Sequence, residues 1–202
     1  MGKIKIIGLT GQTGAGKSTV CDLLRKQGHH VIDCDLAARA VTEKGGRCLA
    51  DIAAAFGGDI LNADGTLNRA KLGKIVFSDS AEKKRLEQII FPYITEKIFA
   101  EIERLRESGA EAVFLDAPTL IESRLYKSCD TVISVTAPQE TRFRRIVLRD
   151  GLDEDAARRR MSAQHSDDFY TSASDIVIEN SGDEPEIGEL LRELRIEKPD
   201  AP

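Results

Sequence analysis

The sequence predicts an α/β fold, in which a parallel sheet is flanked by helices. Short apolar strands alternate with amphipathic helical segments, and this alternation is typical of a parallel sheet. A glycine-rich turn follows the first strand and leads directly into a helix. The chain has 202 residues, which is enough for one α/β domain with a small insertion. The five predicted strands are residues 4–9, 29–32, 111–116, 131–135 and 175–178.

The turn after the first strand has the spacing Gly11-x4-Gly16-Lys17-Ser18, which is that of a phosphate-binding loop (P-loop). Glycines allow a tight turn that directs successive N–H groups at an anion, and the following helix adds its positive N-terminal end. Lys17 can reach the β- and γ-phosphates, and the Ser18 hydroxyl can bind Mg²⁺. A glycine-rich turn without a ligand is the competing interpretation, but glycines, lysine and hydroxyl all fall in place. The motif predicts binding of a nucleoside triphosphate.

The composition limits the classes of function. The net charge is −5 and the pI is near 5.4, whereas general nucleic-acid binders usually have a basic surface. No apolar run is long enough for a transmembrane helix, and the first strand begins too early for a signal peptide. The four cysteines are scattered and the three histidines form no ligand set. We therefore expect a cytoplasmic protein without membrane or nucleic-acid partners.

Carboxylates follow two of the predicted strands. Asp33 and Asp35 come at the end of the second strand, where ligands bind in open α/β sheets. Asp35 could instead only cap a helix over residues 36–41. Asp116 ends the third strand, where it could hold the Mg²⁺ shell or form a simple turn before Pro118.

The middle of the chain shows no parallel-strand pattern. Helices are predicted around residues 49–56, 69–77 and 94–105, and Pro92 must start, kink or end a helix. An Asp64-Gly65 turn separates the first two of these helices.

These helices suggest a division of the chain into functional regions. We interpret residues 43–107 as a helical insertion that binds the second substrate. Residues 1–42 and 108–202 would form the nucleotide-binding core.

Arginines are concentrated late in the chain. They surround an Asp150-Gly151-Leu152-Asp153 turn, in which Asp153 can cap a second helix. Two helices joined at a glycine and lined with arginine favour a lid over phosphates, because guanidinium groups bind phosphate oxygens and stay charged. A solvated charged face is the alternative, since nearby acidic residues neutralise part of the charge. We expect a lid at residues 145–166, with Arg149 as its leading candidate. The arginines are Arg142, Arg144, Arg145, Arg149, Arg158, Arg159 and Arg160.

The class of P-loop protein follows from what surrounds the loop. The Asn-Lys-x-Asp tetrapeptide of GTPases and the Leu-Ser-Gly-Gly-Gln signature of ABC-type ATPases do not occur. The chain length, the helical insertion and the arginine-rich lid favour a small-molecule kinase of the nucleoside-monophosphate-kinase type.

Motifs along nearly the whole chain resemble the dephospho-CoA kinase family. The Asp-x-Asp and Asp-Gly-Thr-Leu motifs are more specific than the P-loop alone. Two positions depart from the family: Phe91 stands where His is usual, and Thr119 where Leu is usual. Because Phe91 carries no imidazole, the resemblance implies no imidazole at this position of the substrate pocket. The matching segments are 10–19, 31–39, 56–57, 64–69, 72, 75–77, 116–122, 125–126, 145–150 and Arg160-Met161-x-x-Gln164.

The resemblance implies transfer of the ATP γ-phosphoryl group, with Mg²⁺, to the ribose 3′-hydroxyl of dephospho-CoA. It implies Asp35 as the general base, with Asp33 as the local alternative, and Lys17 and Arg149 as groups that stabilise the transferred phosphoryl. Ser18 would hold Mg²⁺. ATP would be bound by Thr10, Gly11, Gln12, Thr13, Gly14, Ala15, Gly16, Lys17, Ser18 and Thr19. The acceptor would be bound by Asp33, Asp35, Arg39, Pro118 and Leu120.

Other interpretations stay open. Arg39 lies one helical turn beyond Asp35 and could form only a surface salt bridge. The chain could be another P-loop kinase, acting on a nucleoside monophosphate or shikimate, or a module that senses ATP without transferring phosphate. The helix at residues 94–105 could pack inside the subunit or against a second one, so we expect a monomer or a weak homo-oligomer.

Overall fold

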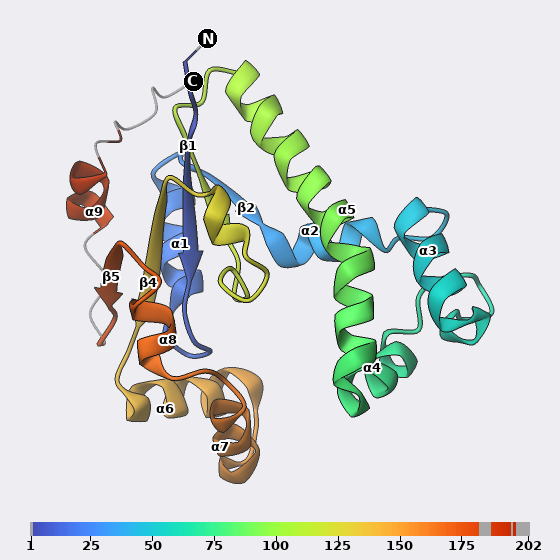
Figure 1. Cartoon of the computed structure of the whole chain (residues 1–202). Coiled ribbons are helices and arrows are strands. Elements are labelled where there is room, and N and C mark those ends of the chain that lie inside the picture. Colours follow the sequence, from blue (N-terminus) through green and yellow to red (C-terminus); the bar gives the residue numbers. More distant parts are fainter. Residues whose placement is uncertain (1, 182–186, 195, 197–202) are drawn as a thin grey trace. The chain divides into compact units, whose positions relative to one another are not determined.

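The computed structural model describes residues 2–181, 187–194 and 196 (Figure 1). The chain forms two compact units, Met1–Ile32 with Leu105–Pro202, and Asp33–Arg104. The second unit begins earlier than residue 43, where the sequence places the start of the insertion. The assignment of the regions to ATP and to the acceptor stays a prediction.

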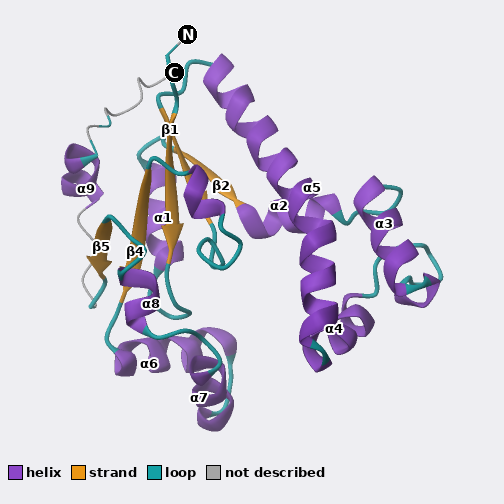
Figure 2. Cartoon of the chain, in the orientation of Figure 1, coloured by secondary structure: helices purple, strands orange, loops and turns teal. Residues whose placement is uncertain are grey.

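Five parallel strands form one sheet (Figure 2). Their order is β2-β3-β1-β4-β5, so β1 lies in the middle, with β3 and β4 paired to it in parallel. The predicted α/β fold with a five-stranded parallel sheet is confirmed, and the strand order is new information. The strands are β1 (Lys5–Thr10), β2 (His30–Asp33), β3 (Ala112–Asp116), β4 (Thr131–Thr136) and β5 (Ile176–Glu179).

The core of the first unit lies between the sheet and its helices. Inner strands of a parallel sheet are covered on both faces, which explains why β3 is a continuous apolar run with Phe114 fully buried. Helix α1 (Lys17–Lys26) turns its apolar side, Val20 and Leu24, into the same core. The strand before the glycine-rich turn and the helix after it are therefore both anchored. Other members of this core are Ile7, Leu9, Ile133, Val135, Leu190, Leu191 and Leu194.

Two helices, α6 (Gln139–Asp150) and α7 (Glu154–Ser162), lie beyond the carboxyl edge of the sheet, toward which the arrowheads of β1 and β5 point in Figure 2. Helix α8 (Asp167–Thr171) packs against β4, where Ser134 Oγ donates a hydrogen bond to the Tyr170 carbonyl at 3.0 Å. Gly151 ends α6 with a φ of 61°, and the Asp153 side chain accepts a hydrogen bond from the Ala156 N–H at 2.7 Å. The predicted glycine joint and helix cap are confirmed.

The rest of the first unit includes the short 3-10 helix η2 (Leu125–Ser128) and α9 (Ile187–Glu193). Helix α9 contributes Leu190 and Leu191 to the core of this unit. The residues after Ile196, whose charge and prolines predict a frayed tail from the sequence, lie outside the described residues.

The second unit is helical, as the sequence predicts for this part of the chain. Asn68 caps α4, and Pro92 lies inside one 28-residue helix, α5, rather than at a helix end. The cluster Cys48, Ile52, Ile60, Leu72 and Val76 forms its own small core. No described helix of the protein is both long and apolar enough to cross a membrane. The elements are α2 (Cys34–Val41), α3 (Arg47–Phe56), η1 (Gly58–Ile60), α4 (Arg69–Ser78) and α5 (Ser80–Glu107), whose last turn belongs to the first unit.

Candidate active site

The glycine-rich turn has the backbone that its motif predicts. Gly11, Gly14 and Gly16 have φ angles of 146°, 79° and 93°, values that other residues rarely adopt. A Cβ at Gly14 would stand 2.7 Å from the carbonyl oxygen of Arg142, and one at Gly11 would collide with the carbonyl of Val135. These positions thus need glycine both for conformation and for close backbone packing.

Lys17 and Asp116 are brought together at the start of α1 and the end of β3. Lys17 Nζ forms an ion pair with Asp116 Oδ1, and the two side chains are only 14% and 13% exposed. The pairing follows from the sheet order, because β1 and β3 are neighbours and Leu9 is in register with Asp116. Burial, together with Asp116, raises the pKa of the Cys21 thiol to about 12, so this thiol stays neutral. Asp116 is therefore more than a turn residue.

The tip of the loop is bound by the connection between α7 and α8. The Thr13 N–H donates to Gln164 Oε1 at 3.0 Å, and Gln12 Nε2 donates to the His165 carbonyl at 2.7 Å. The Arg149 guanidinium also donates to Thr13 Oγ1 at 3.4 Å. The lid candidate Arg149 and the P-loop are thus in contact.

The other arginines of the stretch differ in their surroundings. Arg149 and Arg160 both bind Asp150, and the hydrogen bond from Arg149 lowers the pKa of the Asp150 carboxyl. Arg144 and Arg158 form exposed pairs with acidic residues one helical turn away on their own helices, which suits the alternative of a solvated charged face. Arg142, by contrast, is only 6% exposed and binds Gln12 Oε1.

Asn180 is a site residue that sequence reasoning missed. It is 4% exposed, follows β5, and accepts hydrogen bonds from Arg145. The sequence placed Arg145 only within the lid, whereas its guanidinium contacts the loop backbone. Its position in the sequence could have indicated it, because Asn180 comes directly after a predicted strand and therefore lies at the carboxyl edge of the sheet.

Asp33 and Asp35 have different roles at the start of α2. Asp33 Oδ1 accepts a hydrogen bond from the Leu36 N–H at 2.9 Å, so Asp33 is the helix cap. The interpretation of Asp35 as the cap is therefore wrong, because the helix begins at Cys34, two residues earlier than expected. Asp35 and Arg39 are exposed and lie one helical turn apart.

The two acceptor candidates after β3 lie in the first unit. The Pro118 carbonyl accepts a hydrogen bond from Thr10 Oγ1 at 3.3 Å. Leu120 is fully buried, and its methyl groups lie against Gly8 of β1. Leu120 thus packs beneath the site, and its contact with an acceptor stays a prediction.

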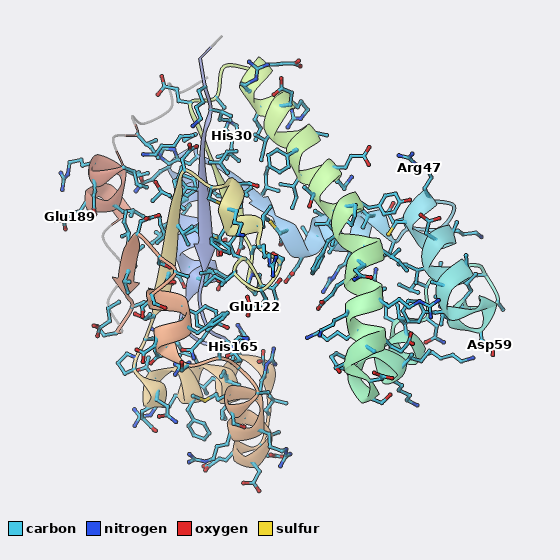
Figure 3. All side chains as sticks on the ribbon, viewed as in Figure 1. His30, Arg47, Asp59, Glu122, His165 and Glu189 are labelled. Carbon is cyan, nitrogen blue, oxygen red and sulfur yellow. The ribbon has the colours of Figure 1, made fainter. Side chains whose placement is uncertain are left out.

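A second set of contacts surrounds the α7–α8 connection. His165 Nε2 lies 3.9 Å from Glu122 Oε1, and the two side chains face each other in Figure 3. The His165 ring stacks on Phe169 with centroids 3.9 Å apart. Burial, together with Glu122, raises the pKa of Tyr170 to about 12, so Tyr170 keeps its proton. The α7–α8 connection therefore contacts Glu122 through His165, in addition to its hydrogen bonds to the P-loop.

Comparison with known proteins points to one family. The family model described as dephospho-CoA kinase matches residues 5–186. A dephospho-CoA kinase from Listeria innocua is 43% identical over 177 residues, which are 88% of each chain. The crystal structure of TT1252 from Thermus thermophilus has a TM-score of 0.80 at 32% identity and covers 96% of both chains. The dephospho-CoA kinase from Campylobacter jejuni has a TM-score of 0.67 at 26% identity, over 94% of this chain and 96% of its own.

These matches extend over nearly the whole chain, as do the motifs that the sequence shares with the family. The resemblance stated from the sequence is confirmed. Since both the family model and a 43% identical relative cover most of its length, the chain belongs to the dephospho-CoA kinase family.

Proposed function

We propose that this chain transfers the γ-phosphoryl group of ATP to the ribose 3′-hydroxyl of dephospho-CoA, giving ADP and CoA. This is the last step of CoA synthesis. The observation that carries the proposal is a complete P-loop, with Lys17 at the start of α1, in a chain of this family. Phosphoryl transfer of this kind depends mainly on positioning and charge stabilisation, because its transition state is loose.

The donor side of the reaction belongs to residues Thr10–Thr19. Their backbone N–H groups and the N-terminus of α1 bind the phosphates. Lys17 stabilises charge on the β- and γ-phosphates, and Arg149 on the transferred group. The contact between Arg149 and Thr13 Oγ1 supports this role for Arg149.

Mg²⁺ fits the residues present at the loop. The Ser18 hydroxyl is exposed at the start of α1, and the Asp116 carboxylate ends β3. Both are the hard oxygen donors that Mg²⁺ prefers. When bound, the ion neutralises charge on the β- and γ-phosphates. Ser18 would hold it directly, while Asp116 also keeps Lys17 in place.

The acceptor side belongs to Asp33, Asp35, Arg39, Pro118 and Leu120. Asp35 acts as the general base that takes the proton of the ribose hydroxyl. The choice of Asp35 over Asp33 is supported by the helix cap, because one carboxylate oxygen of Asp33 is already engaged by the Leu36 N–H. Arg39, one turn further along α2, binds the acceptor.

We further propose a cytoplasmic location and a monomer or weak homo-oligomer. All four cysteines are free thiols, which suits a reducing compartment. Size-exclusion chromatography with light scattering would contradict this proposal on oligomeric state if it gave a stable oligomer at micromolar concentration.

The test of function is coupled ADP release with ATP, Mg²⁺ and one acceptor at a time: dephospho-CoA, AMP, CMP or shikimate. We expect release with dephospho-CoA alone and a product heavier by one phosphoryl group. Release with another acceptor would contradict dephospho-CoA as the substrate but would still support kinase activity. ATP binding without acceptor-dependent release would indicate a nucleotide-sensing module.

A further inference from the structure

We infer that Gln164 is a positioning residue for the nucleotide's phosphates, which it serves by holding the P-loop from the α7–α8 connection. The connection is residues 163–166, between the end of α7 and the start of α8. The inference rests on the proposed use of ATP and adds a residue that acts through the loop rather than on the substrate.

The tip of the loop lies between two permissive residues. Gly11 and Gly14 flank Gln12 and Thr13, and both have positive φ angles, 146° and 79°. Glycine adopts positive and negative φ about equally well, so the orientation of the tip depends on the contacts that Gln12 and Thr13 make. Within the loop, the Gln12 carbonyl accepts a hydrogen bond from the Ala15 N–H at 3.1 Å. The orientation of the tip's N–H groups therefore depends on the hydrogen bonds that the tip makes.

Gln164 and His165 accept hydrogen bonds from the tip of the loop. Gln164 Oε1 accepts the Thr13 N–H at 3.0 Å, and this contact fixes the peptide plane between Gln12 and Thr13. One residue later, the His165 carbonyl accepts Gln12 Nε2 at 2.7 Å. Consecutive residues of the connection thus bind consecutive residues of the tip.

The connection is itself anchored, so it can act as a fixed support. Arg142, which is almost fully buried, binds Gln12 Oε1 and lies 3.5 Å from the carboxylate of Asp167 in α8. The His165 ring stacks on Phe169 and faces Glu122 (Figure 3). None of these anchors depends on Gln164, so a change of Gln164 should release the Thr13 N–H while leaving the support and the contacts of the Gln12 side chain in place.

The consequence concerns ATP affinity. A P-loop whose N–H groups already point inward binds phosphates without first ordering itself, which is the benefit of preorganisation. Removal of the Gln164 acceptor leaves the Thr13 N–H without this partner, so this peptide group is less well ordered. A lost hydrogen bond of this kind is expected to weaken ATP binding by about tenfold.

The experiment compares Gln164→Met, Gln164→Glu and Gln139→Met in the full chain. Met has a similar length but lacks the strong acceptor, whereas Glu retains an acceptor oxygen. Gln139 is the exposed first residue of α6 and serves as the control for the same substitution. The readouts are ATP affinity by calorimetry and hydrogen exchange of the Thr13 amide by NMR, both without acceptor.

We expect Gln164→Met to bind ATP about tenfold more weakly and to exchange the Thr13 amide faster, with Gln139→Met like wild type. Gln164→Glu should restore slow exchange at Thr13, even though its charge repels phosphate. Unchanged ATP affinity and exchange in Gln164→Met would overturn the inference. So would fast Thr13 exchange in a folded Gln164→Glu, which keeps the test decisive if Gln164→Met does not fold. Neither readout uses dephospho-CoA, so a failure of the proposed substrate is seen separately.

Discussion

Arg145 joins the backbone of the P-loop to Asn180, the residue that follows β5. Its Nη2 donates to Asn180 Oδ1 at 3.2 Å, and its Nη1 lies 3.2 Å from the Asn180 carbonyl. The same Nη1 lies 3.3 Å from the carbonyl oxygens of Gly14 and Ala15. A planar guanidinium can serve several acceptors at once, and here it ties the loop to an edge strand of the sheet.

Replacement of Arg145 by Lys should therefore destabilise the protein although charge is kept. Lys cannot reach both Asn180 and the loop carbonyls, and we expect a loss of about 1–3 kcal/mol in the free energy of unfolding. Urea denaturation measures it. Arg144→Lys is the matched control, because Arg144 forms only an exposed pair with Glu140 and should change stability by less than about 0.5 kcal/mol. Equal effects of the two changes would contradict the role of Arg145.

A comparison of Gly14 with Gly45 separates two costs of replacing a glycine: the strain of a positive φ and the steric clash of a new Cβ. Their φ angles are 79° and 80°, but a Cβ at Gly14 meets the Arg142 backbone at 2.7 Å, whereas one at Gly45 meets nothing within 4 Å. Gly45→Ala should cost about 1–2 kcal/mol, the strain of a left-handed residue. Gly14→Ala should cost more and also weaken ATP binding. Thermal unfolding and ATP titration measure the two effects, and similar losses in both variants would mean that the close approach to Arg142 is unimportant.

Asp35→Asn tests the general base. We expect kcat to fall on the order of 10²–10⁴-fold while ATP and acceptor still bind, because Asn cannot take the proton. Asp33→Asn is the comparison: Asn caps helices as well as Asp, so folding should stay near wild type, and kcat should fall far less than in Asp35→Asn. Steady-state kinetics decide between them. A normal rate in Asp35→Asn with a large loss in Asp33→Asn would assign the base to Asp33.

Arg149→Ala tests the lid. Arg149 lies next to Thr13 of the loop, and its pKa is raised by its hydrogen bond to Asp150, so it is charged at any working pH. Loss of this charge should lower kcat by about 10-fold or more if it stabilises the transferred group. Arg159→Ala, at an exposed position of α7, should leave kcat unchanged. An unchanged kcat in both variants would favour a solvated charged face.

His29 should make the protein less stable in mild acid. The residue is 6% exposed, packs edge-on against Phe114, and its Nε2 has no partner among the described residues. Burial lowers the pKa of His29 from 6.5, and the neighbouring His30 lowers it further. The unfolded chain therefore takes up a proton as pH falls below about 6.5 that the folded chain does not, and stability decreases by up to about 1.4 kcal/mol per pH unit.

Urea denaturation between pH 5.5 and 7.5, at roughly half-unit steps around the ordinary His pKa, measures this slope. His29→Leu should flatten it. His30→Gln, at an exposed position, should not, apart from the small influence of His30 on its neighbour. Equal slopes in wild type and His29→Leu would show that other groups control the acid sensitivity.

Local patterns in the sequence predicted most of the fold. Each strand was placed within one residue of its observed ends, and Pro92 was the main uncertainty within the helices. These features depend on periodicity and on single residues such as Gly151 and Asp153, whose effects act over a few neighbours. The exception at Asp35 has the same origin, since two aspartates close together compete for one cap and spacing alone does not choose.

The candidate site was predictable only in part. Glycine spacing and the position of Lys17 are local, so the loop was found from its residues alone. The partner of Lys17 is Asp116, 99 residues away, and the sequence could offer only two uses for that carboxylate. Because β3 and β1 are neighbours in the sheet, Asp116 pairs with Lys17, a contact that neither use had named, and its part in holding Mg²⁺ stays a prediction.

By itself, the sequence determined the strands, the helices, the phosphate loop and the family of this protein, because these depend on short-range pattern. Only the tertiary structure decided which side chains hold the loop. Gln164 is 151 residues from Thr13, and Asn180 is 35 residues from Arg145. Their contacts arise because parallel strands bring their carboxyl ends, and the segments that follow them, to one edge of the sheet.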